Sequence, residues 1–396
     1  RRVCLCFVIV LWCFLLCSCK PKNPAVEDVR RTKRPMMGTL VEIVWRATGE
    51  GDEVETVRSA MDRMETLASR MSLYSRDSEL AEINSEAGRA PVKVSDELLD
   101  VIEKSLTISR RTEGAFDVTV GSVEAVWGDI QKEGGGRLPG EEAIRDALDR
   151  VGYQRVRIDR GAKTIFLEQA GMRLDLGGIA KGYIVDQAMA WLNRRGLREA
   201  LINAGGDILA SGIDESLSWR IGLQDPLEEG RLLGVFVVRK GAVVTSGSYE
   251  RYFETAEGRF AHILDPKTGR PAEGLLSATV IAEESFLADA LATALMVGGH
   301  KNAIFLLGRF PSAKAVLVEQ DGTIWVEERL RDVLKLGPLP SRNIVRFYGS
   351  GPLSLHLSIP QVPGPLFPDN QRCAWVVQGR NPNLSQNLSA PWLLTW

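Results

Sequence analysis

The stretch Ala200-Leu-Ile-Asn-Ala-Gly-Gly-Asp-Ile-Leu-Ala210 has two short apolar runs on either side of a glycine pair. This pattern predicts two strands joined by a tight turn. A helix is predicted just before it, over residues 179–195, and two more strands follow at 235–238 and 242–245. Strands that arrive in pairs, with helices between the groups, favour an α+β fold over a doubly wound parallel sheet.

Helices and paired strands are also predicted before and after this segment of the chain. Methionines at helical spacing predict the core face of a helix. Ser95 is a candidate N-cap, and Asp321-Gly322 is a hairpin turn signal. The predicted elements are a strand at 39–45, helices at 57–71, 95–111 and 285–297, and paired strands at 315–318 and 323–326.

Length and composition limit the class of protein. The chain has 396 residues, with 49 Lys and Arg against 51 Asp and Glu. The length suits two domains or one large domain, and the balanced charge argues against a nucleic-acid partner. Five of the six cysteines lie in the first 19 residues, and the three histidines are far apart. Zinc ribbons and iron–sulfur centres are therefore excluded, and a metal would have oxygen ligands, as magnesium or calcium does.

The N-terminal residues predict a targeting signal. Two arginines precede an apolar run over residues 3–16, which is short for a membrane-spanning helix of roughly 20 residues. The run ends at Leu16-Cys17-Ser18-Cys19, which is similar to a bacterial lipobox. We predict a signal peptide over 1–18, lipidation of Cys19 and a tether over 19–33. A lipid anchor would hold the protein to a membrane of the bacterial cell envelope, facing the periplasm or the exterior. A plain signal peptide or an uncleaved anchor is the alternative.

Residues 338–396 differ from the rest of the chain. They hold half of the 18 prolines and few charged residues. This composition predicts an irregular C-terminal tail. The alternative is a tail that binds a partner.

Two runs in the body of the chain carry candidate chemistry for a phosphate group and a metal. In Asp175-Leu-Gly-Gly-Ile-Ala-Lys-Gly182, a predicted short strand ends, two glycines follow and a helix begins, which suits phosphate binding. Taken alone, the run is more often a plain strand–helix turn, and its spacing disfavours a Rossmann dehydrogenase. Asp289 and Thr293 share one face of a predicted buried helix. A buried carboxylate needs a partner, which could be a hard cation, backbone N–H groups or an arginine.

A third run, His262-Ile-Leu-Asp-Pro-Lys-Thr-Gly269, follows a predicted strand and enters a turn. A histidine with an aspartate three residues later suits a general base. A structural turn with a surface histidine is the alternative.

Taken together, these runs resemble the ApbE family of flavin transferases, over about residues 34–337. No single motif is specific, but the ordered set is. The matching runs are Pro35-Met-Met-Gly-Thr39, Met71-Ser-Leu-Tyr-Ser-Arg-Asp-Ser-Glu-Leu80, Gly114-Ala-Phe-Asp117, Asp175-Leu-Gly-Gly-Ile-Ala-Lys-Gly182, Asn203-Ala-Gly-Gly-Asp207, His262-Ile-Leu-Asp-Pro266 and Ala288-Asp-Ala-Leu-Ala-Thr293.

The resemblance implies an enzyme that uses FAD and Mg²⁺ and transfers FMN to a threonine of a target flavoprotein, such as a membrane redox-pump subunit, with release of AMP. It also implies a two-lobed α+β fold with FAD in a cleft between the lobes. The implied general base is His262, oriented by Asp265. The implied metal ligands are the backbone oxygen of Gly178 and the side chains of Asp289 and Thr293. The implied FAD contacts are Met37, Tyr74, Ala115, Phe116, Asp117, Asp175, Lys181 and Ile263.

Two other functions remain open at this point. The same site with water as acceptor would hydrolyse FAD to FMN and AMP. A non-catalytic envelope lipoprotein that binds flavin would release no AMP. The pair Asp289 and Thr293 favours catalysis, because simple binding does not require a metal at the pyrophosphate.

Overall fold

The computed structural model describes residues 28–132, 138–213, 218–249, 252–255, 258–340, 343–349 and 373–377. The predicted signal peptide over 1–18, Cys19 and the first part of the predicted tether lie outside the described residues. Those predictions therefore remain untested.

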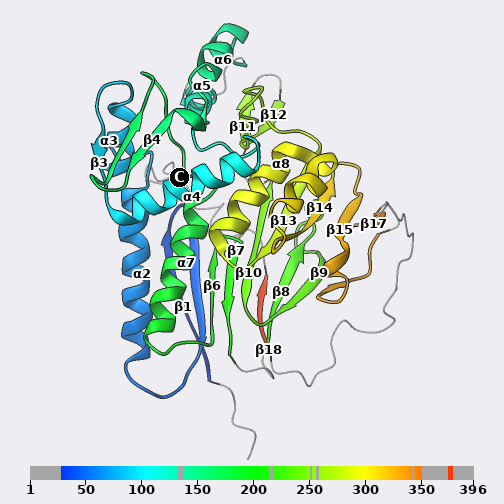
Figure 1. Ribbon diagram of the computed structural model, residues 1–396. Coiled ribbons are helices and arrows are strands. Elements are labelled where there is room, and N and C mark those ends of the chain that lie inside the picture. Colours follow the sequence, from blue (N-terminus) through cyan, green and yellow to red (C-terminus); the bar gives the residue numbers. More distant parts are fainter. Residues whose placement is uncertain are drawn as a thin grey trace, which may run out of the picture.

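A nine-stranded sheet forms the centre of the molecule (Figure 1). Neighbouring strands pair antiparallel throughout, except for the last pair, β15 and β17, which is parallel. This pattern confirms the predicted α+β class. In spatial order the strands are β1 (Val29–Met36), β2 (Thr39–Arg46), β6 (Ala200–Ala204), β7 (Asp207–Ser211), β10 (Gly241–Gly247), β13 (Leu275–Ala282), β14 (Lys314–Glu319), β15 (Ile324–Glu327) and β17 (Val345–Tyr348).

Four long helices cover one face of this sheet (Figure 1). They are α2 (Glu53–Arg70), α4 (Asp96–Arg111), α7 (Ala180–Arg194) and α8 (Ser285–Gly308). By length and composition, α8 is apolar enough to span a membrane, but half of its most apolar window is buried inside the molecule. It packs against β10 and β13 and against α7, so we interpret it as a core helix.

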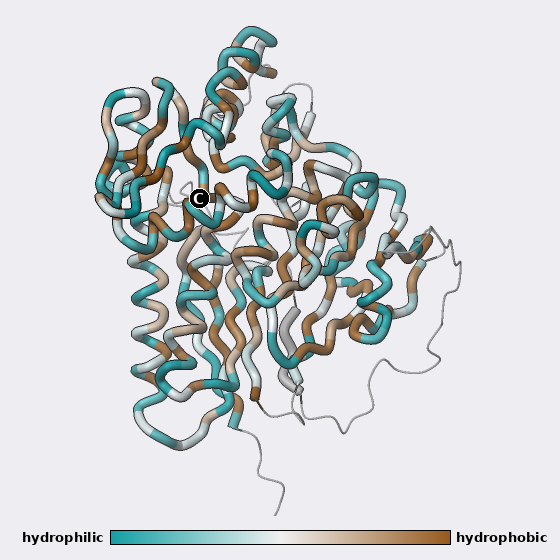
Figure 2. The backbone as a smooth tube through the Cα atoms, viewed as in Figure 1, coloured by the Kyte–Doolittle hydropathy of each residue, from teal (hydrophilic) through white to brown (hydrophobic). Residues whose placement is uncertain are grey.

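A smaller sheet lies on the opposite face. Its strands, in order, are β16 (Leu334–Leu336), β9 (Leu232–Val238), β8 (Ser218–Gln224) and β18 (Cys373–Val377). Side chains alternate along a strand, so the large sheet contributes side chains to two hydrophobic cores, one on each of its faces. In β10, for example, Ala242 and Val244 pack with the helices, whereas Val243 packs with the small sheet. Figure 2 shows the central strands as mainly hydrophobic and the outer turns as mainly hydrophilic.

The remaining elements lie at one end of the molecule. Trp127 on α5 is buried there against Phe253 and Phe260 of the β11–β12 hairpin, with ring centroids 5.5 and 6.0 Å away. These elements are α3 (Glu79–Ser85), α5 (Gly121–Lys132), α6 (Glu141–Leu148), the strands β3 (Val92–Lys93), β4 (Val156–Asp159), β5 (Thr164–Leu167), β11 (Tyr252–Thr255) and β12 (Gly258–Ala261), and the 3₁₀ turn Tyr153–Arg155. The 3₁₀ turn Glu328–Leu330 follows β15 instead, and its Leu330 joins the core on the side of the small sheet.

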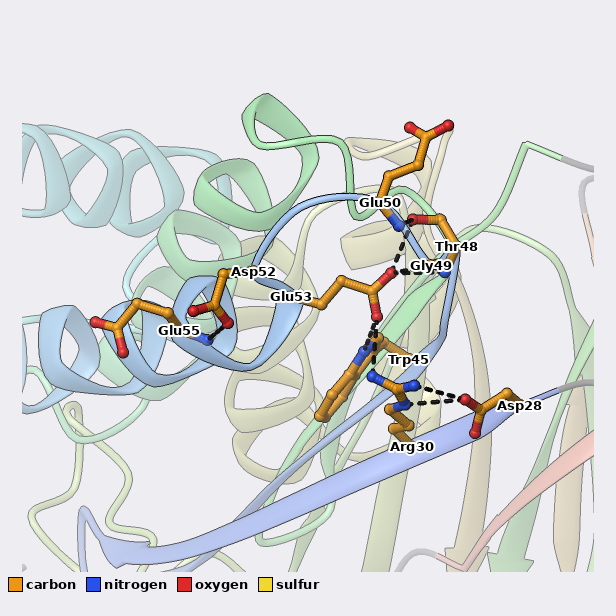
Figure 3. Close-up of polar contacts among 9 residues, drawn as sticks. All are labelled: Asp28, Arg30, Trp45, Thr48, Gly49, Glu50, Asp52, Glu53 and Glu55. Carbon is orange, nitrogen blue, oxygen red and sulfur yellow. Dashed lines mark hydrogen bonds and ion pairs between the residues drawn. The ribbon is translucent and has the colours of Figure 1, made fainter.

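The start of α2 shows how a buried carboxylate fixes an element (Figure 3). The Glu53 carboxylate accepts hydrogen bonds from the Thr48 backbone N–H at 2.6 Å, the Thr48 hydroxyl at 2.8 Å, the Gly49 N–H at 3.1 Å and the Trp45 indole N–H at 3.1 Å. Arg30 of β1 lies 3.6 Å from the same group. Burial raises the pKa of Glu53, but the hydrogen bonds outweigh it and leave that pKa below its ordinary value. The β2–α2 connection is thereby tied to the edge of the sheet.

The tether predicted over 19–33 is wrong for its last residues. Residues 29–33 belong to β1, whose backbone pairs with β2 over its whole length. The charged side chains in this segment lie at the edge of the sheet, where they are exposed without interrupting the hydrogen bonds.

The irregular tail predicted over 338–396 is wrong for two short segments, because β17 and β18 pair with β15 and β8. Within β17, Val345 and Tyr348 are buried, and the Tyr348 hydroxyl donates to the Ala315 carbonyl at 3.1 Å. Apolar burial therefore outweighs the proline-rich composition of the surrounding residues.

Three other predictions differ in detail. The strand expected to end at Asp175 is only an isolated bridge between Val120 and Arg173. The strands predicted at 235–238 and 242–245 belong to different sheets. The helix predicted to end at 297 continues to Gly308, but Gly299 interrupts it with φ 67°, a conformation that glycine adopts readily.

Candidate active site

The start of α7 and the first turns of α8 form the centre of the candidate site. Two glycines before and within α7 allow the two segments to approach closely. A Cβ added to Gly178 would lie 3.0 Å from the Thr293 hydroxyl oxygen and 3.3 Å from the ring of Phe116. A Cβ added to Gly182 would overlap the backbone carbonyl of Ser285. Side chains at these two positions would separate the helices.

Asp289 is buried at this contact. Its Oδ2 accepts a hydrogen bond from the backbone N–H of Gly182 at 3.1 Å. Thr293 lies one turn further along α8 and faces Gly178, where an added Cβ would lie 3.0 Å from the Thr293 hydroxyl oxygen. The three predicted metal ligands, Gly178, Asp289 and Thr293, therefore lie where the segment that leads into α7 meets α8.

The donors present fit Mg²⁺. In the described part of the chain there is no cluster of three or more His, Cys, Asp or Glu that could hold a metal. The predicted set is instead one carboxylate, one hydroxyl and one backbone carbonyl, all of them hard oxygen donors. Mg²⁺ commonly binds through one or two carboxylates together with substrate phosphates and waters.

Asp186 on α7 caps the N-terminus of α8. Its two carboxylate oxygens accept hydrogen bonds from the backbone N–H groups of Ser285 and Phe286, each at 2.8 Å. Burial raises the pKa of Asp186 to about 7, although both hydrogen bonds act in the opposite direction. The N-cap residue of α8 itself, Glu284, makes no side-chain cap hydrogen bond.

Lys181 lies in the first turn of α7 and forms an ion pair with Asp207. The distance from Nζ to Asp207 Oδ2 is 2.6 Å, and Asp207 is buried where β7 begins. The predicted FAD contact Lys181 is therefore fixed between α7 and the β6–β7 turn. The positive end of the α7 dipole adds to its charge for attracting phosphate.

A buried loop brings the next three predicted FAD contacts beside α7. Ala115, Phe116 and Asp117 are all buried. Burial raises the pKa of Asp117, and hydrogen bonds to its carboxylate from both the backbone and the hydroxyl of Thr119 oppose this shift. This loop is joined to Asp175, because the Asp175 N–H donates to the Val118 carbonyl at 2.8 Å.

Met37 and Tyr74 line a pocket further away along the sheet edge. Met37 has φ 53° in the two-residue turn between β1 and β2, which is uncommon for a side chain larger than glycine. Such strain is often found at functional sites. The pocket has a volume of about 410 Å³, and Tyr74 beside it is 56% exposed. The lining residues are Pro35, Met36, Met37, Glu65, Ala68, Ser69, Ser72, Tyr74 and Ser75.

His262 and Ile263 follow β12 and lead into the predicted turn. His262 is partly buried and Ile263 is buried. The Asp265 carboxylate accepts hydrogen bonds from the Lys267 N–H at 2.8 Å and from the Thr268 hydroxyl at 3.2 Å. Asp265 therefore shapes its own turn, and its orientation of His262 stays a prediction.

Comparison with known proteins identifies the family. A model of the ApbE family matches residues 37–317, and the chain belongs to this family. It is 36% identical over 285 residues to the FAD:protein FMN transferase of Treponema pallidum (strain Nichols), an alignment that covers 67% of this chain and 78% of that protein. It is 29% identical over 334 residues to the FAD:protein FMN transferase of Escherichia coli (strain K12), covering 81% and 94%.

Solved structures agree with this assignment. The crystal structure of the ApbE protein of Thermotoga maritima superposes with a TM-score of 0.71 at 32% identity and covers 77% of this chain and 99% of that chain. The flavin transferase ApbE of Vibrio cholerae superposes with a TM-score of 0.64 at 27% identity, covering 74% and 94%.

The sequence analysis assigned no functional role to Asp186 or Gly182. It identified Asp207 only as the last residue of a predicted turn. One signal was available for the first two. Gly178, Gly182 and Asp186 recur every four residues, and Ser285, Asp289 and Thr293 do the same. Residues four apart lie on one helix face, so two such series suggest facing helices.

Proposed function

We propose that this protein transfers FMN from FAD to a threonine hydroxyl of a target flavoprotein, with release of AMP and in dependence on Mg²⁺. Membership of the ApbE family supports the reaction class, and the relatives above carry the name FAD:protein FMN transferase. One structural observation carries the proposal. Gly178 faces Thr293 with no room for a side chain between them, and the Gly182 N–H, next to Lys181 in the chain, donates to Asp289.

The reaction is a phosphoryl transfer in which positioning and electrostatics do most of the work. The acceptor oxygen forms a bond to the phosphorus of the FMN moiety. The bond between that phosphorus and the bridging oxygen breaks, and AMP leaves with the bridging oxygen. His262 takes the proton of the acceptor hydroxyl. Lys181, held by Asp207, and the N-terminus of α7 orient the pyrophosphate.

The Asp289 carboxylate, the Thr293 hydroxyl and the Gly178 carbonyl would hold Mg²⁺. When bound, the ion would offset negative charge on the pyrophosphate and on the leaving AMP. Asp289 is kept in place for this role by the Gly182 N–H. Because the oxygen set leaves room for phosphate and water ligands, substrate would complete the coordination.

We further propose that Cys19 is lipidated and anchors the protein to a membrane of the cell envelope. The lipobox-like run Leu16-Cys17-Ser18-Cys19 after an apolar segment supports this. The acceptor would then be a flavoprotein on the same side of the membrane, such as a redox-pump subunit. Metabolic labelling with a fatty acid, compared between the native protein and Cys19→Ser, tests the anchor.

Incubation of the protein with FAD and a candidate acceptor domain, with and without Mg²⁺, tests the reaction. We expect the intact mass of the acceptor to increase by one FMN, with an equal amount of AMP, only when Mg²⁺ is present. AMP and free FMN with an unmodified acceptor would instead indicate a hydrolase. Bound FAD without any AMP would indicate a flavin-binding lipoprotein.

A further inference from the structure

The two helices of the site meet in an ordered series of contacts. Going forward along α7 and backward along α8, Gly178 contacts Thr293, and Gly182 contacts both Asp289 and Ser285. Asp186 then accepts hydrogen bonds from Ser285 and Phe286. Asp186 is therefore the last member of the series that includes the proposed metal ligands.

The contact made by Asp186 defines where α8 begins. The first N–H groups of a helix have no partner within the helix, and a side chain usually satisfies them. Glu284 makes no such bond from its side chain. The cap comes instead from a carboxylate on the neighbouring helix, which uses both of its oxygens at 2.8 Å. The first turn of α8 is thus attached to α7 rather than to its own preceding loop.

Asp289 lies one turn beyond this cap on α8, and the Gly182 N–H donates to it at 3.1 Å. Packing against β10, β13 and α7 holds the body of α8 in place. The two bonds to Asp186 add a directional attachment to α7 at the start of α8, one turn before Asp289. This attachment limits small shifts of the first turns of α8, where Asp289 lies.

We propose that Asp186 is a positioning residue for the metal site: by capping α8 from α7 it fixes Asp289 and Thr293 against Gly178. Asp186 acts through the helix and needs no contact with FAD, acceptor or metal. This inference rests on the proposed function, since it assumes that those three residues bind Mg²⁺. Groups that hydrogen-bond directly to metal ligands typically change metal affinity by 10–100-fold when replaced. Asp186 acts through the helix, so we expect an effect at the lower end of this range.

The experiment measures Mg²⁺ binding by calorimetry to the full chain loaded with FAD, without acceptor. It is done at pH 8, above the pKa of about 7 for Asp186. Asp186→Asn keeps the size of the side chain but presents an amide N–H₂ to one of the two helix N–H groups. We expect Mg²⁺ to bind about tenfold more weakly to this variant. FAD affinity without Mg²⁺ should be unchanged, and kcat should recover at saturating Mg²⁺.

Asp52→Asn is the matched control. Asp52 caps α2 by accepting a hydrogen bond from the Glu55 N–H at 2.9 Å, and α2 carries none of the proposed metal ligands. This variant makes the same substitution at the cap of another helix, where the amide oxygen can still accept from the Glu55 N–H, so it should leave the Mg²⁺ affinity unaltered. Asp186→Glu, which keeps a carboxylate, should bind Mg²⁺ more tightly than Asp186→Asn.

The outcomes separate this inference from the proposed function. A folded Asp186→Asn with native Mg²⁺ affinity would overturn the positioning role alone. A native protein that binds no Mg²⁺ would overturn both. If Asp186→Asn does not fold, Asp186→Ser removes the carboxylate without adding N–H groups. The same Mg²⁺ titration is then made on Asp186→Ser, and native Mg²⁺ affinity in that variant would overturn the positioning role.

Discussion

At the scale of single residues, the site depends on the lack of a side chain at Gly178. The absence of a side chain lets the backbone there reach Thr293 and Phe116. Its φ lies outside the left-handed region, so alanine is not excluded by backbone conformation. Any effect of a Cβ at Gly178 therefore reports on space between α7 and α8.

Gly178→Ala should reduce Mg²⁺-dependent FMN transfer by about tenfold or more, because the added methyl displaces Thr293. The matched control is Gly128→Ala within α5, where a Cβ meets nothing within 4 Å. That change should leave transfer unaltered and stabilise the protein by about 0.5–1 kcal/mol through helix propensity. Initial rates over a range of Mg²⁺ concentrations, with urea unfolding of both variants, provide the measurements. Equal rates for the two variants would contradict the proposed closeness of Gly178 to the metal.

Asp289→Ala should abolish Mg²⁺-dependent transfer, because it removes the only carboxylate of the proposed ligand set. Loss of the acceptor for the Gly182 N–H should also cost about 1–3 kcal/mol of stability. Transfer is measured as FMN-modified acceptor over time, under conditions in which circular dichroism shows the variant folded. Activity near that of the native protein would exclude this metal site.

At the scale of elements, Glu53 holds the connection between β2 and α2. This connection is far in sequence from the α7–α8 contact. In Figure 3 the Glu53 carboxylate points into a group of donors, whereas that of Glu50 points away. One carboxylate thereby joins β1, β2 and α2. This arrangement makes the stability of the helical layer dependent on pH.

Glu53→Gln should lower the free energy of unfolding by about 1–3 kcal/mol at neutral pH, because the amide N–H₂ would face the Trp45 N–H or the Thr48 N–H. The pKa of Glu53 is lowered by folding from an ordinary value of 4.5. Its stabilisation is therefore complete above that value and is lost as pH falls through the folded pKa.

Urea unfolding at several pH values checks this expectation, with Glu50→Gln as the control. The difference between native protein and Glu53→Gln should be largest near neutrality and should shrink below about pH 4.5. A difference that is constant with pH, or equal for the two variants, would show that Glu53 is not ionised in the folded protein. FMN transfer should be unchanged in both.

The elements that sequence could predict were those with a regular apolar pattern. Of the helices with a buried stripe, α4 begins and ends close to the predicted residues, whereas α2 begins about one turn before its predicted start. The β14–β15 hairpin follows its Asp-Gly signal. β1 was missed because its exposed positions are charged. The cap from Asp186 was missed because it joins residues 99 and 100 positions apart. The four-residue spacing on each helix indicates a facing pair but does not identify which side chain caps which helix.

At the scale of the whole molecule, the central sheet separates two cores and extends beyond the predicted end of the domain. β17 adds a ninth strand after residue 337. Asn343 donates to the Gly322 carbonyl at 3.0 Å, and Val345 and Tyr348 are buried. Val345 joins the core on the side of the small sheet, and Tyr348 joins the core on the side of the helices. None of the proposed site residues lies on β17, so we expect this strand to contribute to stability rather than to chemistry.

A chain ending at residue 349 should therefore be more stable than one ending at residue 337, by at least about 2 kcal/mol from the burial of Val345 and Tyr348. The two should transfer FMN at similar rates. Urea unfolding and the acceptor-mass assay measure both properties. Equal stability would mean that residues 338–349 add nothing to the sheet.

The central claim is that the contact between α7 and α8 forms the metal and pyrophosphate site. The most direct measurement is an anomalous difference map from crystals soaked with FAD and Mn²⁺, which replaces Mg²⁺ at oxygen sites and scatters anomalously. We predict one strong peak in contact with the Asp289 carboxylate, the Thr293 hydroxyl and the Gly178 carbonyl, beside the FAD pyrophosphate. Ordered FAD with a Mn²⁺ peak elsewhere, or with no peak at these three residues, would contradict the claim.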